Sequence, residues 1–507
     1  MKLNPMRSRF LSLFFIVLVL PLSNLFFPAS ASPTAFVQKL IVVPVEFQDL
    51  DHMKSEKELD EALVKAGDYW KEVSYGEIDL KIAVAHWHRL NRSSDYYGQN
   101  PEGKRANETR YKEMIIEAVS LSDDEINFEA YNMLAILFAG TGEDVSKNPN
   151  DLWPWAFWNW TRLTEADGVV IHGAVIIPEN RNPSFDTLGV YVHEIGHNIQ
   201  SHYGDRESLL DLYDAYGNKT FLGPWSVMAE GEWLGGGSRP SELEAWSRIR
   251  MGWLDPESVR PTEIGVTLRL YSLEQRSATR AIKIPVNESN YYLVESRLRI
   301  GYDSDIPQEG ILITLVDIDR KSGEGIVRAV CHRPHLENLH DVLYQVQELF
   351  ADTRSNIFIY VKSKRDNAYD IQISSRIALI HIDFPTEFDA LSNIEGKIKV
   401  MDALGNPVKN AHVEAIIDNR TYGIVTCDEA GEGKLGVNFN LFETGQHTIL
   451  LDLSDQIAST TSRETFYVRF PDWIYVAVLL LILLGIVVAH QMSRCLRQTN
   501  RSSFCPS

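Results

Sequence analysis

The residues best suited to chemistry are two histidines and a glutamate within residues 191–197, which read Y-V-H-E-I-G-H. In a helix, the four-residue step places His193 and His197 on one side, where both imidazoles can bind a single divalent metal ion. Glu194 lies beside them, where its carboxylate can accept a proton from water activated by the metal. The H-E-x-x-H spacing therefore predicts a zinc hydrolase. The competing interpretation is a buried helix with two hydrogen-bonded structural histidines.

The residues around this motif are typical of an amphipathic helix. On a helical wheel, four apolar residues lie within about 60° of one another, roughly opposite the two histidines. These residues are Leu188, Val192, Ile195 and Ile199. Ser184 is the expected N-cap and Gly204 the expected stop, which predicts a helix of about five turns. The apolar stripe would face the core, and the histidines would face a cleft.

A zinc ion that activates water needs a third protein ligand and one open position. Spacing alone does not choose among the candidates that follow His197. These candidates are His202, Asp205, Glu207, Asp211 and Asp214. Further along, Met228 is expected either as an apolar floor beneath the metal or as an ordinary core methionine.

Several separate stretches resemble the immune inhibitor A family of secreted zinc metallopeptidases, and together they span roughly residues 38 to 317. In order, they are residues 40–49, 73–76, 193–197, 210–214, 223–228, 245–253, 291–297 and 310–313. The resemblance implies a zincin fold, one catalytic Zn²⁺ and hydrolysis of peptide bonds in protein or peptide substrates. It also implies the ligand pattern H-E-x-x-H-x-x-G-x-x-D, with Glu194 as the catalytic base. Calcium is a possible further ion in such a protein, and no residue argues for it.

The chain departs from this ligand pattern after the second histidine. Gln200 stands in the position of the glycine and Tyr203 in the position of the acid, and the Leu-Asp-Leu-Tyr-Asp stretch follows about eight residues later than in the family. If the additional residues form a loop, the resemblance assigns Asp211 as the third ligand, and this is the prediction. If they do not form a loop, Asp205 or Glu207 takes that place.

The two ends of the chain predict export and a membrane anchor. Residues 1–31 have the basic start, apolar run and Ala-Ser-Ala ending of a secretory signal peptide. Residues 473–489 carry no charge and can cross a bilayer, with arginines following in the predicted cytoplasmic tail, residues 490–507. This order predicts a single-pass protein at the cell surface with its ectodomain outside. The competing interpretation of residues 473–489 is a buried hydrophobic helix.

The composition fits an extracellular glycoprotein. The net charge of −20 and the isoelectric point near 5.2 count against nucleic acid as a partner. Six N-x-Ser/Thr sequons are potential glycan sites: Asn91, Asn107, Asn159, Asn218, Asn287 and Asn419. Cys331 and Cys427 either form the one ectodomain disulfide that the sequence allows or stay unpaired. The oligomeric state is not predicted.

The hydrophobic patterns predict an α+β protein with a zincin-like catalytic domain, a β-rich domain and an Ig-like β-sandwich ahead of the transmembrane helix. The expected boundaries are residues 36–258, 259–378 and 379–471. Strands are expected at residues 40–47, 78–82, 133–139 and 169–177, with helices at residues 56–73 and 339–350. The sandwich is expected to be a spacer. His172 is interpreted as a structural histidine.

Four tryptophans crowd into eight residues and allow two interpretations: Trp153, Trp155, Trp158 and Trp160. They would pack in a core or an interdomain seam, which is the commoner use of such residues, or they would wall a substrate cleft.

Two functions remain open at this point. The first is a membrane-anchored, outward-facing zinc endopeptidase. The second is a catalytically inactive cell-surface binding or adhesion protein on a peptidase scaffold, because the spacing after His197 is altered.

Overall fold

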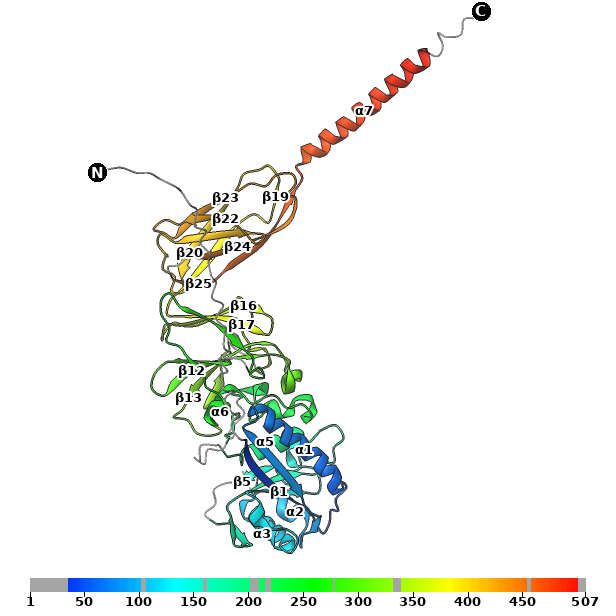
Figure 1. Cartoon of the computed structure of the whole chain (residues 1–507), viewed down its shortest axis with the longest axis vertical. Helices are drawn as coiled ribbons and strands as arrows, with labels where there is room; N and C mark the ends of the chain where they lie inside the picture. The colour runs from blue at the N-terminus through cyan, green and yellow to red at the C-terminus, as the bar shows by residue number, and fades with distance from the viewer. Residues whose placement is uncertain are drawn as a thin grey trace, which may run out of the picture.

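The computed structural model describes residues 35–101, 106–157, 162–200, 209–214, 220–276, 279–331, 339–453 and 457–499. It is a mixed α/β chain, rich in strands, in which successive sheets are followed by one long C-terminal helix (Figure 1). The predicted signal peptide, residues 1–31, lies outside the described residues.

A six-stranded sheet positions the helix that carries the two histidines. Its order is β2 (Ile78–Val84), β1 (Phe36–Glu46), β4 (Met133–Phe138), β8 (Ala174–Pro178) and β5 (Trp155–Phe157), with β3 (His88–Arg89) also paired to β1. Strands β2, β1, β4 and β8 run parallel, and β5 is antiparallel at the end of the sheet. The central strands are apolar on both faces because both faces are covered.

Helices cover each face of this sheet. Side chains of α1 (Glu56–Val73) and α5 (Leu188–Gly196) share one core with Leu40 and Val42 of β1. Helix α3 (Glu108–Ser122) packs on the opposite face, against Ile41 and Val43. The alternation along β1 therefore separates two cores, and α5 lies in the α1 layer.

Helix α5 is shorter than the sequence predicts. The expected five turns from Ser184 to Gly204 are wrong, because the helix spans Leu188–Gly196, and Gly204 lies outside the described residues. Its start is fixed by Asp186, whose carboxylate accepts a hydrogen bond from the Leu188 amide at 2.9 Å. After His197, the backbone amides of Asn198 and Ile199 donate to the carbonyl oxygens of Ile195 and Gly196, which are hydrogen bonds of the 3₁₀ type. The predicted apolar stripe is confirmed, since its four residues are all buried: Leu188, Val192, Ile195 and Ile199.

Short elements complete this first region. They are α2 (Ser94–Gly98), η1 (Phe128–Ala130), α4 (Glu143–Ser146), β6 (Thr164–Ala166), β7 (Val169–Ile171), η2 (Gly223–Trp225), η3 (Glu230–Gly237) and α6 (Ala245–Arg250). The strand expected over residues 169–177 is instead two strands, because β7 pairs with β6 in a separate hairpin and β8 joins the main sheet. The exposed His172 lies in the turn between them.

Two sheets follow, and they share one core. One has the order β14 (Val327–Ala329), β13 (Gly310–Asp317), β12 (Asn290–Arg297), β11 (Ala281–Pro285) and β9 (Glu257–Ser258); the other has the order β10 (Val266–Tyr271), β17 (Ala368–Ser374), β16 (Ile357–Arg365) and β15 (Leu349–Asp352). Leu293, Leu312 and Val316 face the other way and join the core of the first region. The two regions are therefore packed together.

The helix predicted over residues 339–350 is wrong. Only a single 3₁₀ turn, η5 (Leu339–Asp341), forms there, together with the start of β15. Tyr344 exchanges two backbone hydrogen bonds with Ile311, at 2.9 and 3.0 Å. These cross-strand bonds override the local helical pattern.

A second pair of sheets forms the last globular region, around its own apolar core. One sheet has the order β23 (Glu432–Val437), β20 (Ile394–Asp402), β18 (Ile377–Asp383) and β25 (Ala458–Ser459); the other has the order β19 (Glu387–Asp389), β26 (Ser462–Arg469), β24 (Gly445–Leu453), β21 (His412–Ile417) and β22 (Arg420–Thr426). Cys427 is buried in this core and Cys331 packs against the first one, and the two cysteines are not bonded to each other. The disulfide that the sequence allowed is therefore not formed.

Helix α7 (Asp472–Thr499) extends away from the last sandwich, at the far end from the six-stranded sheet (Figure 1). Residues 472–493 have a mean hydropathy of 2.6 and are long enough to cross a membrane. None of this stretch is buried against the rest of the chain, so the interpretation as a buried hydrophobic helix is wrong. The helix continues past residue 489, where the predicted span ends.

Substituting Gly189→Ala tests how closely α5 packs on η3. A Cβ at Gly189 would lie 1.9 Å from the backbone oxygen of Glu232, so the added methyl group forces the two segments apart. We expect the free energy of unfolding of this region to fall by about 1–3 kcal/mol. The measurement is urea unfolding of the full-length protein in detergent, followed by tryptophan fluorescence. The matched control is Gly423→Ala, where no atom lies within 4 Å of the new methyl group. Equal unfolding midpoints for the two variants would contradict this packing.

Candidate metal centre

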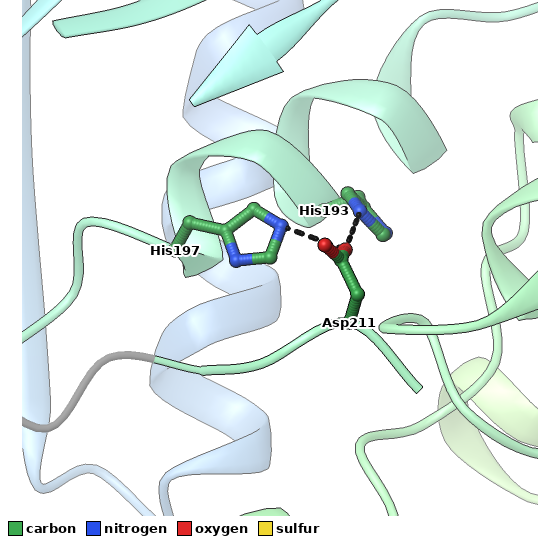
Figure 2. A group of neighbouring side chains, drawn as sticks. All are labelled: His193, His197 and Asp211. Carbon is green, nitrogen blue, oxygen red and sulfur yellow. Dashed lines mark ion pairs between the residues drawn. The ribbon is translucent and has the colours of Figure 1, made fainter. Parts of the chain in front are cut away.

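Three side chains converge where the sequence predicts a metal: His193, His197 and Asp211 (Figure 2). The Nε2 atoms of the two histidines lie 3.4 and 3.2 Å from Oδ1 of Asp211. One ligand atom from each residue lies within 4.8 Å of the other two, which is close enough for one ion to contact all three. The histidines come from the end of α5, and Asp211 comes from an irregular segment that passes beneath it.

The other third-ligand candidates divide into two groups. Asp214 is described and lines the neighbouring cavity, but it does not belong to the converging group. His202, Asp205 and Glu207 lie outside the described residues. The structure therefore brings together the set that the resemblance assigned, in spite of the changed spacing after His197.

Backbone carbonyls orient both imidazole rings. Nδ1 of His193 lies 2.8 Å from the carbonyl oxygen of Val227, and Nδ1 of His197 lies 2.8 Å from that of Leu209. A carbonyl only accepts hydrogen bonds, so each Nδ1 carries the proton and donates it. Each Nε2 then points toward Asp211, where a metal ion can replace its proton. This arrangement is the one that a metal-binding histidine needs.

The segment of Asp211 is held by the β-rich region. Its amide donates a hydrogen bond to Oγ of Ser322 at 3.1 Å, and the amide of Gly323 donates to the carbonyl of Asp211 at 3.1 Å. Both partners lie in the connection between β13 and β14. Sequence reasoning missed Ser322 because it is 111 residues away along the chain and no local spacing marks it.

Met228 lies directly below the end of α5. A Cβ at Gly196 would lie 3.2 Å from the Met228 sulfur and 2.8 Å from the ring of Trp70. Because Gly196 has no side chain, α5 can pack closely against Trp70 and Met228. Met228 is fully buried in the first core, so the interpretation as a core methionine is confirmed.

The charges at the centre favour a bound cation. Burial would raise the pKa of Asp211, but the two imidazoles hold the pKa of this carboxyl well below its usual range. Burial would lower the pKa of His193, but the carboxylates of Glu232 and Asp211 raise it to about 10. Oδ1 of Asp211 is buried and accepts no hydrogen bond of normal geometry from the described residues. Two imidazole nitrogens and one carboxylate oxygen fit a zinc ion, which prefers such ligands.

Glu194 faces a cavity of about 390 Å³ beside this centre. Burial raises the pKa of its carboxyl to about 7, although both histidines oppose the shift. Tyr213 lines the same cavity, with its ring centroid 6.0 Å from that of His193. A carboxylate that exchanges protons near neutral pH, next to a metal set, is suited to general base catalysis.

The tryptophan cluster contributes one side chain to this cavity. Trp153 lines it. Trp155, on the edge strand β5, is 39% exposed and stacks on Phe157, so the packing interpretation is wrong for this residue. Trp158 and Trp160 lie outside the described residues.

Comparison with protein families finds no match, and comparison with curated proteins finds none either. Among solved structures, the CARDB domain of a Pyrococcus furiosus protein aligns at 15% identity over 19% of this chain and 97% of that domain, with a TM-score of 0.16. A putative membrane anchored protein from Corynebacterium diphtheriae aligns at 10% identity over 43% of this chain and 52% of that one, with a TM-score of 0.17. A structure described as a protease aligns at 9% identity over 85% and 97%, with a TM-score of 0.16. These scores establish no shared fold, so the geometry of the site carries the functional argument.

Substituting Asp211→Asn tests the third ligand. An amide is a poor zinc ligand. Removing a residue that only hydrogen-bonds to a metal ligand already lowers metal affinity by up to about 100-fold, so we expect the loss of the ligand itself to lower zinc affinity by at least about 100-fold. Metal content after dialysis and competition with a chromogenic chelator measure the loss. The control is Asp214→Asn, which should retain zinc because Asp214 lies outside the converging group. Equal zinc binding by both variants would return the role to Asp205 or Glu207.

The zinc affinity should also depend on pH. Zinc needs both imidazoles unprotonated, and the pKa values of His193 and His197 are raised without metal, so protons compete with the ion. We expect affinity to rise as the pH increases toward about 10, where His193 loses its proton, and to fall on acidification. Chelator competition at several pH values measures it. An affinity that is independent of pH would contradict histidine ligation.

Proposed function

We propose that this chain is a zinc metalloendopeptidase with a zincin-like catalytic region, anchored in a membrane and facing outward. The observation that carries the proposal is the convergence of His193, His197 and Asp211 beside Glu194, at the wall of a cavity that His193 and Glu194 line. The resemblance of the sequence to the immune inhibitor A family supports the same reaction.

The residues of the centre divide the work of peptide hydrolysis. A zinc ion held by the three ligands would polarise the scissile carbonyl and make water more acidic. Glu194 takes a proton from the attacking water on its carboxylate and then gives it to the leaving amine. Its pKa, raised by burial to about 7, suits both transfers. Tyr213 lines the same cavity, where its hydroxyl can donate a hydrogen bond to the substrate oxygen. Tyr216, the other tyrosine in reach along the sequence, lies outside the described residues.

The edge of the six-stranded sheet supports a peptide as the substrate. Strand β5 is the last strand of that sheet and pairs only with β8 among the described strands. It also contacts α5, the helix of the metal centre. An extended peptide can add to such an edge through main-chain hydrogen bonds, which would bring it across the centre.

The placement at a membrane is supported from both ends of the chain. Helix α7 is apolar and unburied over residues 472–493. Residues 1–31 have the pattern of a secretory signal peptide. Together they give an ectodomain outside the cell, with a single C-terminal span.

The alternative function is a catalytically inactive binding or adhesion protein. It was motivated by the altered spacing after His197, which would have left the centre without a third ligand. Because Asp211 lies next to both imidazoles in spite of this spacing, we favour the enzyme.

Substituting Glu194→Gln separates the two functions. We expect zinc content to be retained and the hydrolysis of casein to fall by about 10²–10⁴-fold, because the base is lost while the ligands remain. The control is Glu61→Gln, on the solvent side of α1, where the side chain is 66% exposed and the activity should be unchanged. Chelator-reversible cleavage by the wild-type protein is the reference. A zinc-loaded wild type that cleaves no protein would favour adhesion, and undiminished cleavage by Glu194→Gln would exclude it as the base.

A further inference from the structure

The cavity beside the metal centre has an acidic wall. Besides Glu194, the cavity is lined by four carboxylates and two basic side chains: Asp144, Asp214, Glu230, Glu232, Lys147 and His193 of the candidate metal centre. The acids come from α4, from the segment after Asp211 and from η3, so three separate parts of the chain place negative charge around one space. The proposed chemistry uses none of these four carboxylates.

Asp144 is the most deeply placed of these acids. It is 6% exposed, and neither carboxylate oxygen has a hydrogen-bond partner of normal geometry among the described residues. Burial raises its pKa to about 6, although the amides of Val145 and Asp144 and the charge of Lys147 oppose the shift. A buried carboxylate without a matching donor is costly, so this one is prepared for a cation that the chain itself does not supply.

The other charges of the wall do not cancel Asp144. The Lys147 ammonium donates to the backbone oxygen of Asp144 rather than to its carboxylate. Glu232 lies 3.7 Å from Nδ1 of His193, so its charge is directed toward that imidazole. A positive group in the cavity would therefore meet the carboxylate of Asp144, which no described side chain neutralises.

Resting on the proposed peptidase function, we propose that this cavity binds a lysine or arginine side chain of the substrate, next to the scissile bond, with Asp144 receiving its charge. The volume of about 390 Å³ accommodates a long side chain. Trp153, Val190 and Trp233 line the same space and can pack along its methylene groups. A second metal ion fits less well, because the described residues hold no other group of three ligand side chains close enough to share an ion.

Matched peptides test this specificity in the full-length protein in detergent. Fluorogenic peptides carry one lysine, moved through the positions on both sides of the cleaved bond, and each is compared with the same peptide carrying norleucine. We expect kcat/KM to favour lysine at least about tenfold at one position, the size of effect that one favourable charge pair gives in a partly desolvated pocket. Equal cleavage of every pair would overturn the proposal while leaving the peptidase function standing.

Variants of Asp144 connect the preference to the cavity. Asp144→Asn should reduce the lysine-to-norleucine ratio several-fold, and Asp144→Lys should bring it below one, because a positive charge then repels the substrate. The control is Asp124→Asn, an exposed carboxylate of the same region that does not line the cavity; its ratio should match the wild type. An unchanged ratio in a folded Asp144→Asn protein would remove Asp144 from the pocket, and the wild-type ratio still tests the pocket if that variant does not fold.

A binding measurement separates this inference from the proposed function. The Glu194→Gln protein is titrated with fluorescent peptides that differ only in arginine or citrulline, and anisotropy reports the affinity. We expect the arginine peptide to bind about tenfold more tightly, and Asp144→Asn, combined with Glu194→Gln, to remove most of the difference. If the wild type cleaves nothing but this preference persists, the pocket stands and the enzymatic function fails. Equal binding of both peptides overturns the pocket.

Discussion

The site depends on one buried carboxylate, that of Asp211, held between two imidazoles. Such a group is costly to bury unless positive charge is always near, so the surrounding structure must keep both rings in place. It does so through the carbonyl oxygens of Val227 and Leu209, which accept hydrogen bonds from the two Nδ1 atoms and so direct both Nε2 atoms toward Asp211. The same constraint that stabilises the side chains without metal also prearranges them as ligands.

The β-rich region is part of this support. Arg297 of β12 is fully buried, with its guanidinium 2.7 Å from both oxygens of Asp303 and 2.9 Å from Glu295. It also donates to the carbonyl of Trp225 at 2.9 Å, and this segment leads directly into Val227. Together with Ser322 beside Asp211, these contacts make the second region a structural component of the metal centre. The shared apolar core between the two regions has the same consequence.

The candidate metal centre lies next to an acidic cavity and far along the chain from α7. The acidic wall from Asp144 to Glu232 lies beside Glu194 and His193, so any charge preference is exerted next to the candidate metal centre. The last sandwich stands between this region and α7 along the length of the chain (Figure 1). That arrangement suits the spacer role expected for the sandwich, because it would hold the cavity away from a membrane crossed by α7.

The sequence by itself determined the features that depend on residue spacing and composition within one segment. The four-residue step of a helix placed His193 and His197 on one side with Glu194 beside them, and the apolar stripe of α5, the buried β1 strand and the C-terminal helix followed from periodicity and composition. Tertiary structure decided the rest. The ends of α5, the strand pairing of Tyr344 and the positions of Ser322 and Asp144 depend on contacts between residues far apart in sequence. Asp211 depends on both the sequence and the tertiary structure. A family resemblance of the sequence suggested it as a ligand, and only the fold brings it next to the two imidazoles. Spacing fixes which residues can share a helix face, but the packing of separate segments fixes which of them meet.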